Sequence, residues 1–468
     1  MKLVNQFGSK PCMSIALHDS SRSMLGNVLY LLIVVLMVGG VFTDFISTWL
    51  HFHNSTFWRI SLVFRAGMGV DLTVILLMGM QRWPNYAIWL LAACSVSTIL
   101  LWLGYASTPS ADMGNYLETT FHLYKMIYPI LLFVGLRILL QDHPFLTRRL
   151  FTVLDIILVV YLLFIFVGLL TGNDMFRTYW SGFRPGFKGI IMTQNEATGT
   201  VMVAIFWFGL RYFSRERHIL FFAVSILAAL VLGTKGALLA CVPLVGGMLW
   251  ARYGMIKMLP PFVLLVAVFS VLSLFAYQYS ETVHAGVTLF SNYMAEHLSS
   301  DSTRGIIDLL TSGRSDRLES LLPTLANTFS PLFLVSGMPI AYRSIEIDPV
   351  DAFLRGGLLF LVLLLVAYWK IFFFSGGSGG KRYKLVLFTI WMGIAFTGGH
   401  LWMASTTAPM LIIALAYAGR MEPLGKKVYV ARRKPKIPSF NNSSFGVQNQ
   451  RINIDNQLDL RLKGPPTW

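Results

Sequence analysis

Three basic residues stand inside otherwise apolar stretches of the sequence, namely Arg65, Lys125 and Lys235. A charged side chain within a membrane is costly, so residues of this kind usually have a function. All three are cations, and the topology deduced below puts them in the outer half of the membrane. Fixed positive charge at that depth favours an anionic ligand. The alternative for each residue is a side chain that reaches the nearby lipid headgroups.

Further basic residues occur in connections expected on the same side of the membrane. Arg314 is the most informative, because Asp316 and Glu319 after it have the spacing of a capping box. We expect a helix to begin there and to run to about Leu322, where Pro323 breaks or kinks it. A helix N-terminus beside an arginine suits a phosphate or pyrophosphate, and a solvated arginine on an ordinary amphipathic helix is the alternative. The other basic residues of this group are Arg184, Lys188 and Arg317.

Three carboxylates, Glu346, Asp348 and Asp351, come directly before a long apolar run. A carboxylate beside arginines could accept a proton from an attacking hydroxyl; alternatively, the three balance neighbouring arginines at the headgroups. His400 follows the next apolar run and could bind substrate or transfer protons. No metal-ligand cluster, nucleotide-binding loop or Ser/His/Asp pattern stands out, so the sequence indicates neither a metal nor a cofactor.

The elements that position these residues are membrane-spanning helices. The chain has 468 residues, of which 55% are hydrophobic and 13% charged, whereas soluble domains carry about 25% charged residues. Apolar runs of about 18 or more residues recur, and they are continuous instead of alternating, which excludes a barrel. The net charge of +16 reflects basic residues flanking the spans and in the C-terminal tail, and does not indicate nucleic-acid binding. The sequence predicts an all-α polytopic membrane protein.

The apolar runs predict about twelve spans. Basic residues collect on one side of them, which places both termini in the cytoplasm. The expected organisation is a cytoplasmic tail over 1–23, nine spans over 24–279, one large periplasmic loop over 280–351, three spans over 352–419, and a disordered basic cytoplasmic tail over 420–468. The spans are expected at Met24–Ile46, Ile60–Met80, Tyr86–Tyr105, Phe121–Leu140, Phe151–Thr171, Ile191–Phe213, Ile219–Gly233, Gly236–Trp250, Phe262–Tyr279, Ala352–Phe374, Lys384–Gly399 and Ser405–Gly419.

Several segments resemble, in the same order, segments of the O-antigen ligase and polymerase superfamily. Arg184–Gly189 followed by Gln194–Glu196 is similar to its Arg-Phe-x-Gly…Asn-Asp/Glu segment. Leu232–Leu239 looks like its Ser-x-Ser-Arg-Gly-Ala segment, with Lys235 where the family usually has arginine. Lysine keeps the charge but lacks the bidentate fork.

The remaining segments match the family's large loop. Thr311–Arg314 looks like the Thr-Gly-Arg that opens this loop, and Leu334–Gly337 and Asp348–Phe360 match its closing region and the next span. The ligase branch places a histidine, usually followed by asparagine, about where Asp348 stands here. Its absence favours the polymerase branch.

The resemblance implies a GT-C-like, metal-independent glycosyltransferase in the bacterial inner membrane. Its substrate would be an oligosaccharide linked to undecaprenyl pyrophosphate at the periplasmic face, in O-antigen, capsule or exopolysaccharide synthesis. The cations listed above would hold the pyrophosphate, and Asn195 and Glu196 would contact substrate. A chain-length regulator and a flippase are the expected partners. The alternatives are an O-antigen ligase, a transporter or flippase of an anionic lipid-linked substrate, and a passive assembly subunit.

Overall fold

The computed structural model is almost entirely helical over the residues it describes. These are residues 13–57, 59–79, 83–106, 113–179, 186–214, 216, 218–279, 284, 288, 291–292, 295, 311, 314–328, 331–338, 345–374, 380–397 and 399–421. Within these ranges there is no strand, only an isolated antiparallel bridge between Arg177 and Phe187. The chain divides into two units, Met1–Leu424 and Gly425–Trp468, and the second lies outside the described residues.

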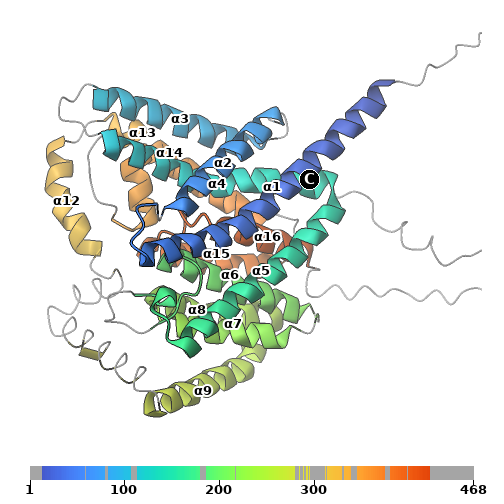
Figure 1. The fold of residues 1–468 in the computed structure, drawn as a ribbon, viewed down its shortest axis with the longest axis vertical. Coiled ribbons are helices and arrows are strands. Elements are labelled where there is room, and N and C mark those ends of the chain that lie inside the picture. The colour runs from blue at the N-terminus through green and yellow to red at the C-terminus, as the bar shows by residue number, and fades with distance from the viewer. Residues whose placement is uncertain are drawn as a thin grey trace, which may run out of the picture. The chain divides into compact units, whose positions relative to one another are not determined.

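A helix occurs at every predicted span (Figure 1). The first begins at Met13, earlier than the predicted Met24. These helices are α1 (Met13–Phe52), α2 (Ile60–Met78), α3 (Asn85–Ala106), α4 (Met113–Asp142), α5 (Pro144–Thr171), α6 (Gln194–Phe213), α7 (Ile219–Leu232), α8 (Lys235–Tyr253), α9 (Met255–Tyr279), α14 (Asp348–Phe374), α15 (Lys381–Thr397) and α16 (Thr407–Arg420).

Seven helices in the described part of the chain are long and apolar enough to cross a membrane: α1 to α5, α8 and α14. Three further helices, α7, α9 and α16, are apolar, but their apolar stretches of 10–17 residues are shorter than this criterion demands. A multi-pass helical membrane protein is therefore consistent with the structure. The count of about twelve spans and the periplasmic loop stay predictions.

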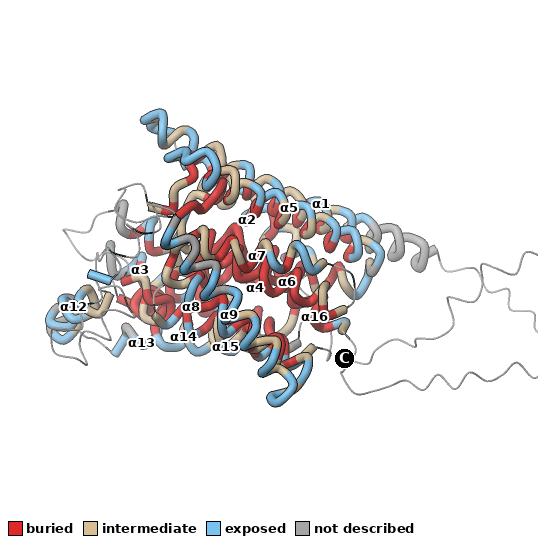
Figure 2. Tube along the Cα trace, turned by 90° about the horizontal axis from the view of Figure 1, so that it is seen from below, coloured by how far each residue is buried: buried red, intermediate tan, exposed pale blue. Residues whose placement is uncertain are grey.

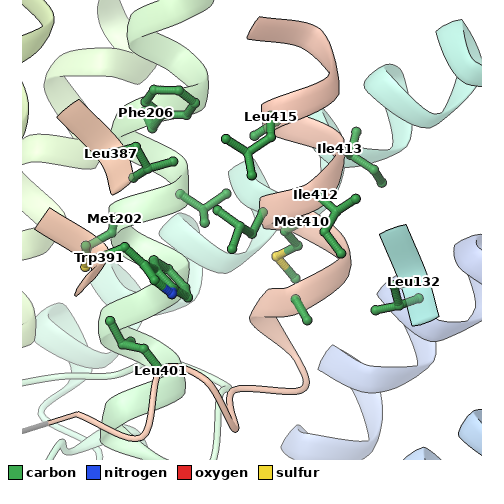
Figure 3. Packing of buried hydrophobic residues seen from close by; sticks show 14 of the residues in the cluster. Leu132, Met202, Phe206, Leu387, Trp391, Leu401, Met410, Ile412, Ile413 and Leu415 are labelled. Carbon is green, nitrogen blue, oxygen red and sulfur yellow. The ribbon is translucent and has the colours of Figure 1, made fainter. Parts of the chain in front are cut away.

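The most buried helices are α4, α6 and α16, which appear red in the burial view (Figure 2). Both α4 and α6 contact α16, and α6 also contacts α7 and α8. Apolar side chains of α6, α15 and α16 face one another in this core, among them Met202, Trp391 and Leu415 (Figure 3). By contrast, α9 contacts α8 and exposes most of its apolar side chains, as expected of a helix facing lipid.

The short break between α7 and α8 falls where the sequence predicts it. Gly233 ends α7 in the left-handed conformation, with φ of 67°, a conformation that favours glycine. Thr234 then caps α8: its hydroxyl accepts a hydrogen bond from the amide of Ala237 at 3.2 Å. Lys235 is therefore the first residue of α8.

The loop helix α12 (Arg314–Thr328) is longer than predicted, because it continues through Pro323 instead of ending at Leu322. Its apolar side chains Leu318, Leu321 and Leu325 lie on one face at helical spacing. They pack against a small core of Met338, Ile345, Ile347 and Leu354. Because this apolar face continues beyond the proline, packing outweighs the one lost backbone hydrogen bond.

The first part of α14 is separated from the rest by a kink. Gly357 has φ of 80° and ψ of 175° inside the helix. The backbone carbonyls before it are used by other elements: Leu354 accepts from the amide of Met338 at 2.7 Å, and Gly356 accepts from the Ser97 hydroxyl of α3 at 2.9 Å. The short helix α13 (Phe333–Ser336) also packs on this region.

We predict that Gly337→Ala destabilises the protein. Gly337 has φ of 71°, and a Cβ there would lie 2.4 Å from backbone atoms of Arg355. The left-handed conformation alone costs about 1–2 kcal/mol for an alanine. Thermal unfolding of the detergent-solubilised protein, followed by intrinsic fluorescence, should show a lower midpoint. Gly67→Ala is the control, because nothing lies within 4 Å of its Cβ position in α2. Equal midpoints for the two variants would contradict the prediction.

Candidate functional site

A buried ion cluster centred on Arg65 joins four parts of the chain. Its Nη2 pairs with Asp44 of α1, and its Nη1 lies 2.9 Å from the Glu196 carboxylate of α6. The same Nη1 donates to the Ser405 hydroxyl, just before α16, at 2.9 Å. The Asp44 side chain is fully buried and that of Arg65 is 12% exposed. One guanidinium thus holds α1, α2, α6 and the start of α16 together.

Glu196 is surrounded by hydrogen-bond donors. Besides Arg65, it accepts from the Ser405 amide at 3.1 Å, the Ser405 hydroxyl at 3.2 Å and the Thr406 hydroxyl at 2.9 Å. It also lies in the first turn of α6, which begins after the Thr193 cap and where the helix dipole favours negative charge. Asn195 beside it is half-buried. The predicted substrate residue Glu196 therefore also holds Arg65.

A small cavity of about 20 Å³ lies against this cluster. Its polar wall contains the two sequence-predicted cations Arg65 and Lys125, and its lining is completed by Leu62, Ala66, Phe121, Tyr124, Tyr128 and Ser405. The Lys125 ammonium lies 4.7 Å from the centre of the Phe121 ring, and none of the described carboxylates forms an ion pair with it. The Nε of Arg65 is buried without a hydrogen-bond partner in the described ranges. The cavity therefore offers positive charge and a donor beside an apolar surface.

A second polar group forms around Asp348, the first residue of α14. Its Oδ1 lies 3.7 Å from Nδ1 of His400, and its Oδ2 accepts from the Trp402 amide at 2.9 Å. Asp348 is fully buried, whereas the His400 side chain is 24% exposed. Such a pair can orient an imidazole for proton transfer. The structure thus brings together two residues that the sequence predicted separately.

Glu346, two residues before α14, holds the start of the loop helix α12. Its carboxylate lies 2.8 Å from Arg314 and 3.1 Å from Arg317. Asp351 accepts from the backbone amides of Ile345 and Glu346, both at 3.0 Å, and so fixes this turn. Partial burial alone would raise the pKa of Glu346, but the charge of Arg314 and the hydrogen bond from Arg317 hold it below its usual range.

The two polar groups are linked by the connection between α15 and α16, residues 398–406. His400 and the Trp402 amide face Asp348. A few residues later, Ser405 and Thr406 bind Glu196. The cavity beside Arg65 and the Asp348–His400 pair are therefore positioned by one short segment.

The remaining predicted cations lie apart from the cavity lining. Lys188 is buried and its ammonium donates to the Met192 carbonyl. Burial lowers the pKa of Lys188 to about 7, although the charge of Asp44 acts in the opposite direction. Lys235 begins α8, next to the Thr234–Thr198 hydroxyl pair (2.8 Å) that joins α8 to α6. Arg184 lies outside the described residues.

Sequence reasoning missed Asp44 and the hydroxyls of Ser405 and Thr406. Asp44 is an acidic residue inside the first apolar run, and the rule that singled out Arg65 applies equally to it. Serine and threonine give no comparable signal, because both are common in apolar helices. Their role follows only from the contact with Glu196.

The chain was also compared with known proteins. No protein-family model and no curated protein matches it. In the described ranges, no three His, Cys, Asp or Glu side chains are placed to hold a metal ion. The chemistry of the site is accordingly inferred from the cavity, the ion cluster and the Asp348–His400 pair.

We predict that acid loosens α12 and that Glu346→Gln does the same at neutral pH. Because the folded-state pKa of Glu346 is lowered, its ion pairs stabilise the loop above the ordinary value of 4.5 and are lost as the pH falls below it. Hydrogen exchange of 314–328, corrected for the intrinsic rate, measures this. Glu319→Gln, an exposed carboxylate on the same helix, is the control. Full protection in Glu346→Gln at neutral pH would contradict the prediction.

Proposed function

We propose that the protein is a membrane glycosyltransferase of the polysaccharide-polymerase type. It transfers a glycan from undecaprenyl pyrophosphate onto a lipid-linked repeat unit at the periplasmic face of the bacterial inner membrane, with both termini in the cytoplasm. The observation that carries the proposal is the cavity in which Arg65 and Lys125 meet an apolar wall. The order of motifs in the sequence supports the same function.

The cavity suits the junction between a polyprenyl chain and its pyrophosphate. Leu62, Ala66 and Phe121 offer an apolar surface to the lipid, while Lys125 offers a charge that is not taken up by a described carboxylate. Arg65 is largely committed to Asp44 and Glu196, so we assign the main phosphate contact to Lys125. Positive charge here stabilises the negative charge that develops on the leaving group.

His400 is the best-placed base for this transfer. The acceptor hydroxyl oxygen attacks the anomeric carbon, and the bond from that carbon to the pyrophosphate oxygen breaks, leaving its electron pair on the pyrophosphate. The hydroxyl proton passes to Nε2 of His400, while Oδ1 of Asp348 lies 3.7 Å from the other ring nitrogen, Nδ1. Asp351 and Glu346 are already bound by backbone amides and arginines, which favours His400 over them.

A polymerase differs from a ligase and from a flippase in its product, which is a longer lipid-linked glycan. Two of the charged residues lie at helix starts: Glu196 is in the first turn of α6, and Asp348 is the first residue of α14. Transporters gather such residues near the midplane of the membrane. Proteoliposomes supplied with lipid-linked repeat units should yield longer lipid-linked glycans, whereas translocation without elongation would support a flippase.

We predict that Lys125→Met lowers polymer synthesis while Lys125→Arg retains it. Loss of one charge-assisted phosphate contact costs about 1.5–3 kcal/mol, or roughly 10- to 150-fold in activity. Polymer made per unit of membrane-inserted protein is the measurement. Lys257→Met, at an exposed position of α9, is the control and should behave like the parent. Parental activity in Lys125→Met would remove Lys125 from the site and with it the main support for the proposal.

We predict that His400→Ala lowers turnover about 10²- to 10⁴-fold, the usual contribution of a general base. Asp348→Asn should cause a smaller loss, because it leaves the imidazole in place but poorly oriented. The double variant should be no worse than His400→Ala alone, since Asp348 acts through His400. His53→Ala, at an exposed position after α1, is the control. Additive losses in the double variant would show that Asp348 acts independently of His400.

A further inference from the structure

The Thr406 hydroxyl lies between two buried carboxyl groups. Its oxygen is 3.0 Å from Oδ2 of Asp44 and 2.9 Å from Oε2 of Glu196. A hydroxyl has one hydrogen and two lone pairs, so it donates fully to one of these oxygens. The other contact is a hydrogen bond only if that carboxyl group is protonated and donates to Thr406. Both contacts can be hydrogen bonds only when Asp44 or Glu196 carries a proton.

The distribution of donors places this proton on Asp44. Glu196 accepts from Arg65, from the Ser405 amide and from the Ser405 hydroxyl, besides Thr406. These donors stabilise a carboxylate. Asp44 is fully buried and has fewer donors, namely Arg65, Thr406 and Ser61. A buried carboxyl with fewer donors is the better proton carrier. The arrangement is a chain in which Asp44 donates to Thr406 and Thr406 donates to Glu196.

We propose that Asp44 holds a titratable proton behind Arg65, and that this proton is taken up when an anion binds in the cavity and released when the anion leaves. The identity of the anion rests on the proposed function. The inference that a proton is present rests only on the contacts of Thr406. Asp44 acts through the charge of the site and through Arg65, and is therefore a positioning residue.

The charges around Asp44 explain the coupling. With Asp44 protonated, Arg65 and Glu196 neutralise each other, and the charge of Lys125 in the cavity wall remains for the anion. With Asp44 ionised, its negative charge offsets that of Lys125, and the anion binds less tightly. By linkage, anion binding raises the fraction of protonated Asp44. Anion affinity should therefore fall as the pH rises.

Other groups near Asp44 do not change this sign. Among the described residues, α4 adds the Tyr128 hydroxyl, and α5 adds that of Tyr161, which donates to the Ala197 carbonyl at 3.2 Å. The short helix η2 (Asp174–Phe176) adds Asp174, which pairs with Arg177 at 2.8 Å. Lys188 precedes α6 and donates to the Met192 carbonyl. Any loss of its positive charge at higher pH also weakens anion binding.

Infrared spectroscopy of the full chain in lipid nanodiscs tests the proton without any substrate. The carbonyl stretch of a buried carboxylic acid should be present at about pH 5 and disappear at higher pH, since a carboxyl must lose its proton there. The band should be weaker in Asp44→Asn, where the fully buried Asp348 can still contribute, and unchanged in Asp71→Asn, an exposed carboxylate on α2. Thr406→Val serves as a second variant and should shift the band, because it removes the hydrogen-bond partner. A band that survives Asp44→Asn unchanged, or no band in the parent, overturns the proposal.

Binding of an isoprenyl sulfate, whose charge is constant over this pH range, tests the coupling. The parent should bind about 10-fold more weakly at high than at low pH, the effect expected for one buried charge, whereas Asp44→Asn should show a clearly smaller change, limited to the loss of charge on Lys188. A parental affinity that does not change with pH overturns the coupling. If Lys125→Met leaves polymer synthesis intact, the glycosyltransferase proposal falls. The infrared band still shows whether Asp44 carries a proton.

Discussion

The contact on which the site depends is the one between Arg65 and two carboxyl groups, Asp44 and Glu196. A buried ion pair offsets its desolvation only when further hydrogen bonds satisfy both partners, and here Ser405 and Thr406 supply them. Because these groups come from α1, α2, α6 and the segment before α16, no helix can shift without exposing a charge. The polar cluster therefore fixes the positions of helices that elsewhere pack mainly through apolar contacts.

The connection 398–406 gives this cluster its relation to the chemistry. It binds Asp348 through the Trp402 amide and Glu196 through Ser405. In the proposed reaction, a charged leaving group departs on one side and a hydroxyl proton departs on the other. One short segment contacts the groups that serve both events. This economy accounts for a site without a nucleotide or metal motif in the sequence.

Much of the fold was predictable, because apolar length alone indicates helices and every predicted span coincides with one. The cations Arg65 and Lys125 were predictable as well, since charge inside an apolar run is costly. The pairing of Arg65 with Asp44 and Glu196 was not predictable, because these two residues are far apart along the chain. Composition also suggested that Pro323 ends the loop helix, whereas the apolar face through Leu325 carries it further. Patterns within one segment could be predicted from the sequence, whereas contacts between distant segments could not.

The kink at Gly357 makes α14 two mechanical parts in one continuous chain. The part before it, with Asp348, is anchored by hydrogen bonds from Met338, just after α13, to Leu354 and from Ser97 of α3 to Gly356. The part after it continues as an apolar helix toward Phe374. A membrane helix adjusts its tilt to the thickness of the bilayer. In the proposed enzyme, a change in tilt beyond Gly357 would leave the contacts of Asp348 in place, because those contacts all lie on the other side of the kink.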